Sequence, residues 1–322
     1  MTGRREGEMV KSVAVLGLVT AILAGSAAVA AANPFIIEPE KPAFTATFGG
    51  RYWYGMGSAS KDLYGLTRDT LNSRLTYSGL QSHSLELYGR VDHDSGLFWK
   101  GYVGGGLLTK GRLQDEDFPP GIAPYSSTNS TLQNQTLGYF DFDAGGAILR
   151  GRDFRLDGFV GYHYMHWRLK AFGCTQTATN TAICNPSVPD STAAIVEDDT
   201  WQGVRVGLNA DLPIYDKWRI DVEGAYLPYV WLSGSDNHLL RADFAGPIPQ
   251  SGHGWGYQFE AILSYQLTDA ISLGLGGRYW HFQSQGTADF TNVTPGGTTQ
   301  PLDFKADIYG VFLQGSYRFD NL

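Results

Sequence analysis

The sequence predicts an all-β fold: a closed antiparallel transmembrane β-barrel of about ten strands, with short periplasmic turns and long extracellular loops. Three observations carry this prediction. Apolar and polar residues alternate with a period of two along most of the chain after residue 33, no apolar stretch there approaches the length of a transmembrane helix, and short connections alternate with long ones. A period of two is typical of a strand whose two faces meet different surroundings.

The first 32 residues are predicted to be an export signal. Basic residues precede an apolar run from Val13 to Leu23, and small residues follow as far as Ala32, which is the order of parts in a secretory signal peptide. Cleavage is expected between Ala30 and Asn33. An anchoring helix is the competing interpretation, but the run is roughly half of the ~20 residues that a bilayer requires. The predicted barrel domain therefore covers residues 33–322.

Composition agrees with a strand-rich chain. The sequence has 41 Gly, 18 Tyr, 17 Phe and 8 Trp, and aromatic residues are enriched in strands, where glycine permits close approach of neighbouring backbones. The formal net charge is −8, so nucleic acid is not an expected partner, because binding phosphates requires clustered Lys and Arg.

The segment around residues 203–212 illustrates the alternation. Val204, Val206 and Leu208 share one face of a strand, and Arg205 and Asn209 share the other. A soluble β-sandwich produces the same pattern and remains an alternative. Long strands, aromatic residues at strand ends and the alternation of short and long connections favour the membrane barrel.

The connections fall into two classes. Short ones are expected at 94–96, 150–152, 213–216 and 267–269, and long ones rich in Ser, Thr, Asn, Gly and Pro near 56–71, 108–134, 173–199, 232–253 and 286–303. Counting between them gives about ten strands from Ala43 to Phe319, with both termini in the periplasm. Bacterial outer-membrane barrels have even strand numbers and close on themselves, which leaves no exposed edge in lipid.

The two cysteines, Cys174 and Cys184, lie in a polar stretch rich in Thr and Asn. This suits a local disulfide in a loop exposed to an oxidising compartment. A metal site or free thiols are the alternatives, but a metal site needs further ligands nearby, and none is present. No metal and no bound cofactor is therefore expected.

Two triplets at the predicted outer rim carry the candidate chemistry. Residues two apart share a face of a strand, so Asp115 and Asp117 aim together, as do Asp236 and His238. If both pairs face inward, a carboxylate pair stands opposite an acid and imidazole pair across a groove. His238 would then accept a proton, Asp236 would orient it, and the opposite pair would hold the attacking water. A solvated loop or a loose cation site is the alternative for a bare Asp-x-Asp.

At these residues the chain resembles the omptin family of outer-membrane proteases. The likeness runs through Ser73 to Asp94, Leu97 to Leu108 leading into Asp115-Glu116-Asp117-Phe118, Asp153 to Leu156 with Gly161-Tyr162, Ser233 to His238, and Tyr317 to Phe319. It implies a ten-stranded barrel with endopeptidase activity, in which Asp115, Asp117, Asp236 and His238 are the catalytic residues.

The chain also departs from the omptin pattern. Gly234 stands where members that cut at basic residues have an acidic residue, and Asp62, Asp211 or Glu116 are possible substitutes. The resemblance implies a need for lipopolysaccharide, and Tyr162 fits one position of its binding surface, whereas Tyr164 and His166 replace charged partners. The expected partners are outer-membrane lipid, lipopolysaccharide and a peptide or protein substrate.

The function that follows is an outer-membrane endopeptidase that activates water directly. A non-catalytic barrel, either a porin-like channel or a structural or adhesive surface protein, is the alternative. A ten-stranded barrel is narrow enough for side chains to fill its lumen, which argues against a wide channel.

Overall fold

The structure is a computed structural model that describes residues 43–118, 123–151 and 154–320. The expected signal peptide, 1–32, and its cleavage region lie outside these residues. Clustering of contacts separates residues 42–322 from the preceding segment as one compact unit. In the part of the chain that the structure describes, no helix is long and apolar enough to cross a membrane.

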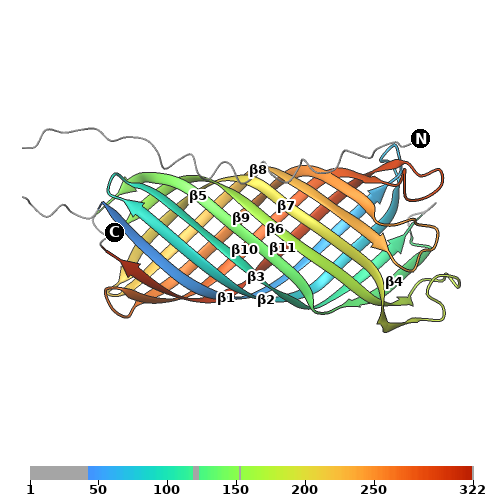
Figure 1. Cartoon of the computed structure of the whole chain (residues 1–322), viewed down its shortest axis with the longest axis horizontal. Helices are drawn as coiled ribbons and strands as arrows, with labels where there is room; N and C mark the ends of the chain where they lie inside the picture. The colour runs from blue at the N-terminus through green and yellow to red at the C-terminus, as the bar shows by residue number, and fades with distance from the viewer. Residues whose placement is uncertain (1–42, 119–122, 152–153, 321–322) are drawn as a thin grey trace, which may run out of the picture. The chain divides into compact units, whose positions relative to one another are not determined.

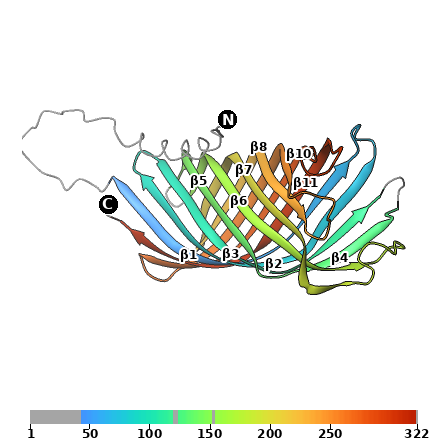
Figure 2. The ribbon, with the colours of Figure 1, turned by 45° about the vertical axis from the view of Figure 1, so that its right-hand side comes forward.

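The described residues form one antiparallel sheet that is rolled into a barrel. Its strands are β1 (Phe44–Tyr64), β2 (Leu71–His93), β3 (Leu97–Asp117), β4 (Ser126–Leu132), β5 (Gln135–Arg150), β6 (Arg155–Gln176), β7 (Val188–Tyr215), β8 (Trp218–His238), β9 (Ile248–Gln266), β10 (Ile271–Asp289) and β11 (Thr299–Phe319). Neighbours in chain order pair with each other, except that β4 and β5 each pair with β3 and β6, and the strands run obliquely around the wall (Figures 1 and 2). The expected all-β barrel is confirmed.

The wall has ten strand positions although eleven strands are labelled. β4 and β5 both lie between β3 and β6, β4 nearer the outer end and β5 below it. The interruption falls at Gln133 and Asn134, and Asn134 has a positive φ of 56°, a conformation that Asn tolerates better than most residues. The expectation of about ten strands is confirmed in this sense.

Pairing between the first and last strands closes the barrel. β1 and β11 are in register from Ala46 with Phe319 to Leu63 with Leu302. β1 therefore begins and β11 ends at the same end of the barrel, as expected (Figure 1). Closure pairs the backbone of both strands and leaves no open sheet edge, as a bilayer requires.

The outer wall carries an apolar band. On β7, Val204, Val206 and Leu208 are exposed, while Arg205 and Asn209 between them are almost fully buried in the lumen. This confirms the alternation that the sequence predicted. The band continues onto the other strands at the end with the short turns, for example at Leu85, Val103, Phe142, Phe259, Leu275 and Leu313. About ten residues per strand suffice to cross a bilayer, so the rest of each strand lies beyond the lipid.

The strands continue beyond the lipid, and this corrects the prediction of long outer loops. Most of the long polar connections are strand: β2 and β3 extend to Leu71 and Asp117, and the first outer connection is reduced to residues 65–70. The prediction failed because these strand ends have water on the outer face. Their composition is polar like that of a loop, although the inner face is buried.

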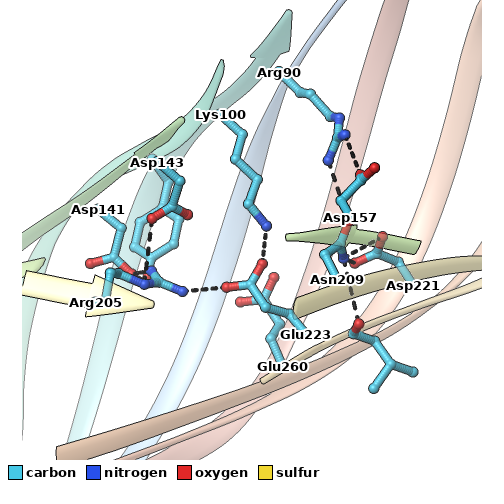
Figure 3. A network of polar contacts seen from close by, with 12 residues as sticks. Arg90, Lys100, Asp141, Asp143, Asp157, Arg205, Asn209, Asp221, Glu223 and Glu260 are labelled. Atoms are coloured by element: carbon cyan, nitrogen blue, oxygen red, sulfur yellow. Dashed lines mark hydrogen bonds and ion pairs between the residues drawn. The ribbon is translucent and has the colours of Figure 1, made fainter. Parts of the chain in front are cut away.

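The lumen within the membrane band is filled by charged and aromatic side chains (Figure 3). Lys100 on β3 contacts Glu223 on β8, and Arg90 on β2 bonds Asp157 on β6 at 2.6 Å, so both pairs cross the lumen from wall to wall. Arg205 joins Glu223 from β7. Further contacts join Arg278 to Glu86 at 2.8 Å, Arg51 to Glu86 at 2.9 Å and His163 to Gln258 at 3.0 Å. The filled, hydrogen-bonded interior agrees with the expectation for a narrow barrel.

The outer connection between β6 and β7 is held by a disulfide. Cys174 and Cys184 are bonded, with 10 residues of sequence separation and Cα atoms 5.6 Å apart. The interpretation of this pair as a local disulfide is confirmed. Below this connection on β6, His163 is fully buried in the lumen, and its ring stacks on that of Phe282 with centroids 5.0 Å apart.

Candidate functional site

The acid and imidazole pair lies at the outer end of β8. Asp236 and His238 face the lumen, because they continue the buried side of the strand that includes Leu232. Nε2 of His238 and Oδ2 of Asp236 are 2.8 Å apart, and the side chains are 17% and 7% exposed. The other carboxylate oxygen of Asp236 is buried without a hydrogen-bond partner. The pair is therefore assembled and largely buried.

The acidic pair lies at the outer end of β3. Asp115 and Asp117 continue the inward face that holds the fully buried Leu113. Asp117 pairs in register with Ser73 of β2, whose hydroxyl stabilises its carboxylate. Oδ1 of Asp115 is buried without a partner. Asp115 thus keeps acceptor capacity that the protein does not use.

The two pairs meet inside the barrel. β3 and β8 stand on nearly opposite walls, four positions apart in the ring of ten. Asp117, Asp236 and His238 line one cavity of about 100 Å³, and Asp115 lies close enough to His238 for their charges to influence each other. The structure brings all four residues together at the end opposite the short turns, on strand ends rather than in the loops where the sequence suggested them.

Burial and neighbouring charges determine which side chains of this cluster are protonated. Burial raises the pKa of Asp115 to about 7; His238 opposes the rise, and Asp117 adds to it. Burial also raises the pKa of Asp117, against the attraction of His238. Burial alone would lower the pKa of His238, but Asp236 and Asp115 outweigh it and raise the pKa to about 9. At neutral pH the imidazole is therefore mostly protonated, and Asp115 is near its midpoint.

A second charged cluster lies directly beside the acid and imidazole pair. Glu197 on β7 pairs in register with Asp236, and such pairs face the same side of a sheet. Nζ of Lys61, from β1, contacts Glu197 and bonds Oδ1 of Asp199 at 2.9 Å and Oε1 of Gln250 at 2.7 Å. Sequence analysis missed this cluster, because Glu197 and Asp199 fall in a stretch that resembles a loop.

A loop between β8 and β9, residues 239–247, covers one side of the site. Phe244 packs its ring against the imidazole of His238 with centroids 5.7 Å apart. Arg241 lines the cavity and pairs with Asp243 at 2.6 Å. Ala245 donates its backbone N–H to the carbonyl of Val293, which ties this loop to the one between β10 and β11.

The proposed substitutes for an acidic residue at position 234 do not reach the site. Asp62 faces the outer wall and pairs with Arg74 at 2.7 Å, and Asp211 pairs with Arg219 near the short turns. Glu116 alternates with Asp115 and so faces away from the cavity. Position 234 itself has no room, because a Cβ there would lie 2.2 Å from Oδ1 of Asp199.

Metal ligands are not gathered at the site. Across residues 43–118, 123–151 and 154–320, no group of three or more His, Cys, Asp or Glu side chains is arranged to hold a metal ion. Nδ1 of His166 lies 3.2 Å from the hydroxyl oxygen of Thr200. Tyr162, which fits one position of the lipopolysaccharide-binding surface that the resemblance implies, donates its hydroxyl hydrogen to Oε1 of Gln202 at 2.7 Å.

The sequence places the chain in a family. Residues 63–319 match the family described as Pom, Protochlamydia outer membrane protein. The chain belongs to this family. It is an outer-membrane β-barrel protein of a bacterium. A comparison with curated protein sequences gives no match.

Solved structures of outer-membrane proteins match the chain to different degrees. The outer membrane protease OmpT from Escherichia coli matches with a TM-score of 0.69 at 14% identity, over 85% of this chain and 97% of OmpT. OprG from Pseudomonas aeruginosa gives a TM-score of 0.34 at 11% identity, over 87% of this chain and 97% of OprG. The translocator domain of the autotransporter NalP from Neisseria meningitidis gives 0.36 at 12% identity, over 88% and 90%. At this identity the likeness to OmpT shows the shared fold alone.

Proposed function

We propose that this Pom-family barrel is an outer-membrane endopeptidase that hydrolyses peptide bonds with directly activated water. The observation that carries the proposal is the meeting of two polar pairs from nearly opposite walls: Asp117, Asp236 and His238 line one cavity, and Asp115 lies within range of the charge of His238. Unpartnered carboxylate oxygens on Asp115 and Asp236 supply acceptors for a water or a substrate N–H. The OmpT likeness supports the same reading at the level of the fold.

The pKa values of Asp115 and His238 indicate which residue is the general base and which is the general acid. A general base must be unprotonated at the working pH and a general acid protonated. Because the pKa of Asp115 is about 7 and that of His238 about 9, Asp115 accepts the proton of the attacking water and His238 donates one to the departing amine. Sequence analysis gave the accepting role to His238; the raised pKa favours this reversal.

The remaining two residues support these transfers. Asp236 orients the imidazole through the 2.8 Å hydrogen bond and stabilises its charged form. Asp117 holds the water beside Asp115. The water oxygen bonds to the carbonyl carbon, the C–N bond then breaks, and no covalent link to the protein forms.

A peptide-cleavage assay tests the proposal. Full-length mature protein, folded with lipopolysaccharide, is incubated with a mixed peptide library, and products are identified by mass spectrometry. We expect cleavage that falls by a factor of about 10²–10⁴ in His238→Ala, the usual contribution of acid or base catalysis. His253→Ala is the matched control, because His253 stacks on Tyr229 on the outer wall. Cleavage that persists unchanged in His238→Ala would exclude the proposed roles.

Lipopolysaccharide is the second element of the proposal, and it stands on the resemblance alone. Omitting it from the folding mixture tests whether cleavage depends on it. A non-catalytic surface role is the outcome if no peptide is cut with lipopolysaccharide present. The channel alternative finds little support, since ion pairs cross the lumen within the membrane band.

A further inference from the structure

The cavity beside the candidate catalytic residues is mainly apolar. Apart from the polar groups already described, its wall is formed by aliphatic and aromatic side chains: Leu63, Leu75, Phe244, Ile248, Ala288, Phe290 and Leu302. A volume of about 100 Å³ corresponds to about three or four non-hydrogen atoms, since a water molecule takes ~30 Å³ of liquid. An aliphatic side chain of the size of valine or leucine matches this space.

Lys61 places a fixed positive charge at the same cavity. Its side chain is 6% exposed and lines the wall, and its ammonium group contacts Glu197, Asp199 and Gln250. Three contacts use all three N–H donors of a lysine. Glu197 and Asp199 therefore share one cation from within the chain, and burial raises the pKa of Glu197 well above its usual value, so the pair carries little net negative charge to attract a cationic group of a substrate.

A further positively charged side chain lines the cavity. Arg241, which lines the cavity from the loop between β8 and β9, adds to the positive charges of Lys61 and the protonated His238. A carboxylate at position 234, which could attract a basic side chain, is sterically excluded by Asp199. A cationic group entering the cavity would therefore meet Lys61, Arg241 and the protonated His238. The carboxylates in the wall, Asp117 and Asp236, already face His238.

We propose that Lys61 is a specificity-determining residue and that the cavity seats an uncharged aliphatic side chain next to the scissile bond, rather than a basic one. The inference deepens the proposed endopeptidase function and rests on it. Lys61 supplies the charge that a basic substrate would otherwise bring, and the apolar wall supplies the contact surface for the aliphatic group.

Matched peptides test the preference directly. Peptides that differ in one residue beside the scissile bond, Leu, Val, Lys or Arg, are compared by kcat/KM on the intact barrel with lipopolysaccharide. We expect the aliphatic peptides to be preferred at least tenfold. Preferred cleavage at Lys or Arg overturns this inference and leaves the proposed function standing, whereas cleavage of no peptide removes the proposed function.

Binding of the same peptides gives a readout that needs no turnover. Isothermal titration with the His238→Ala protein is expected to show tighter binding of the Leu peptide than of the Arg peptide. Equal or tighter binding of the Arg peptide overturns the inference even if the wild-type protein cuts nothing.

Variants at Lys61 assign the preference to this residue. Lys61→Ala leaves Glu197 and Asp199 without their cation, so the preference is expected to move at least tenfold towards Lys and Arg, while Lys61→Arg keeps the aliphatic preference. If Lys61→Ala does not fold, the triple variant Lys61→Met, Glu197→Gln, Asp199→Asn removes the charges together and is also expected to keep the aliphatic preference. A Lys61→Ala variant that keeps the aliphatic preference, or a triple variant that prefers Lys or Arg, would show that residues other than Lys61 determine the specificity.

Discussion

Glu197 and Asp236 lie directly opposite each other on β7 and β8, facing the lumen. Each carries a buried carboxylate oxygen without a partner. Lys61 contacts Glu197 and His238 bonds Asp236, so each of these neighbouring acids has a cationic partner. The protonation of His238 therefore depends on the acids around it, and removing Asp236 is expected to lower the pKa of the imidazole.

The pH dependence of cleavage follows from this balance. Activity is expected to rise as Asp115 loses its proton near pH 7 and to fall as His238 loses its proton near pH 9. Asp236→Asn removes a main cause of the raised imidazole pKa, so the alkaline limit should move down by about 1–3 pH units. The profile of kcat/KM against pH measures both limits. An alkaline limit that stays in place in Asp236→Asn would show that another group controls it.

The free energy of unfolding of the barrel should depend on pH through the titration of Asp115. Its pKa is raised from 3.8 to about 7 in the folded chain, so the folded state holds a proton that the unfolded state releases, and stability falls as pH rises from about 4 to 7. Three pH units correspond to an upper limit of about 4 kcal/mol. Asp115→Asn should therefore be more stable than the wild type at pH 8 and similar to it at pH 4.

Urea unfolding of both proteins at the two pH values tests this. Asp94→Asn, at an exposed turn, is the control and should show no such difference. A gain for Asp115→Asn that is equal at both pH values would point to packing rather than to proton release.

The barrel and the four candidate residues could be anticipated from sequence for one physical reason. In a strand, residues two apart share a face, so the inward or outward assignment of one residue decides that of Asp236 and His238 together. The same period placed Arg205 and Asn209 in the lumen. None of these assignments requires knowledge of which strands are neighbours.

Lys61 and its partners could not be found in this way. The cluster depends on the tilt and register that bring β1, β7 and β9 together at one height of the barrel, and a single sequence does not specify these. Glu197 and Asp199 were further hidden by polar residues around them, which face water above the lipid. The pKa values of Asp115 and His238 depend on the same packing, so the sequence alone could not decide which of the two residues holds the proton.

Gly234 is expected to tolerate no side chain. A Cβ at this position would lie 2.2 Å from Oδ1 of Asp199 and 2.6 Å from the carbonyl oxygen of Asp198, so Asp199 would have to leave its contact with Lys61. Gly234→Ala should destabilise the barrel by about 1–3 kcal/mol, the usual cost of overpacking. The neighbouring Ser233→Ala, on the exposed face, is the control. Unfolding midpoints in urea that agree for the two variants would show that Asp199 moves at no cost.

The ion pairs across the lumen predict that the barrel does not conduct ions freely. Lys100 on β3 reaches Glu223 on β8, and Arg205 holds the same carboxylate from β7. Wild-type protein in planar bilayers should therefore show no steady open current, whereas the double variant Lys100→Ala, Glu223→Ala removes a connection between the two walls and should raise the current.

Lys305→Ala is the control for this measurement, because Lys305 is exposed on the wall and its loss leaves the lumen unchanged. A steady wild-type current as large as that of the double variant would mean that the charged side chains line a path for ions instead of closing it. The porin-like alternative would then regain support. Cleavage assays on the same double variant separate the two functions, since the candidate catalytic residues lie beyond the membrane band and should keep their geometry.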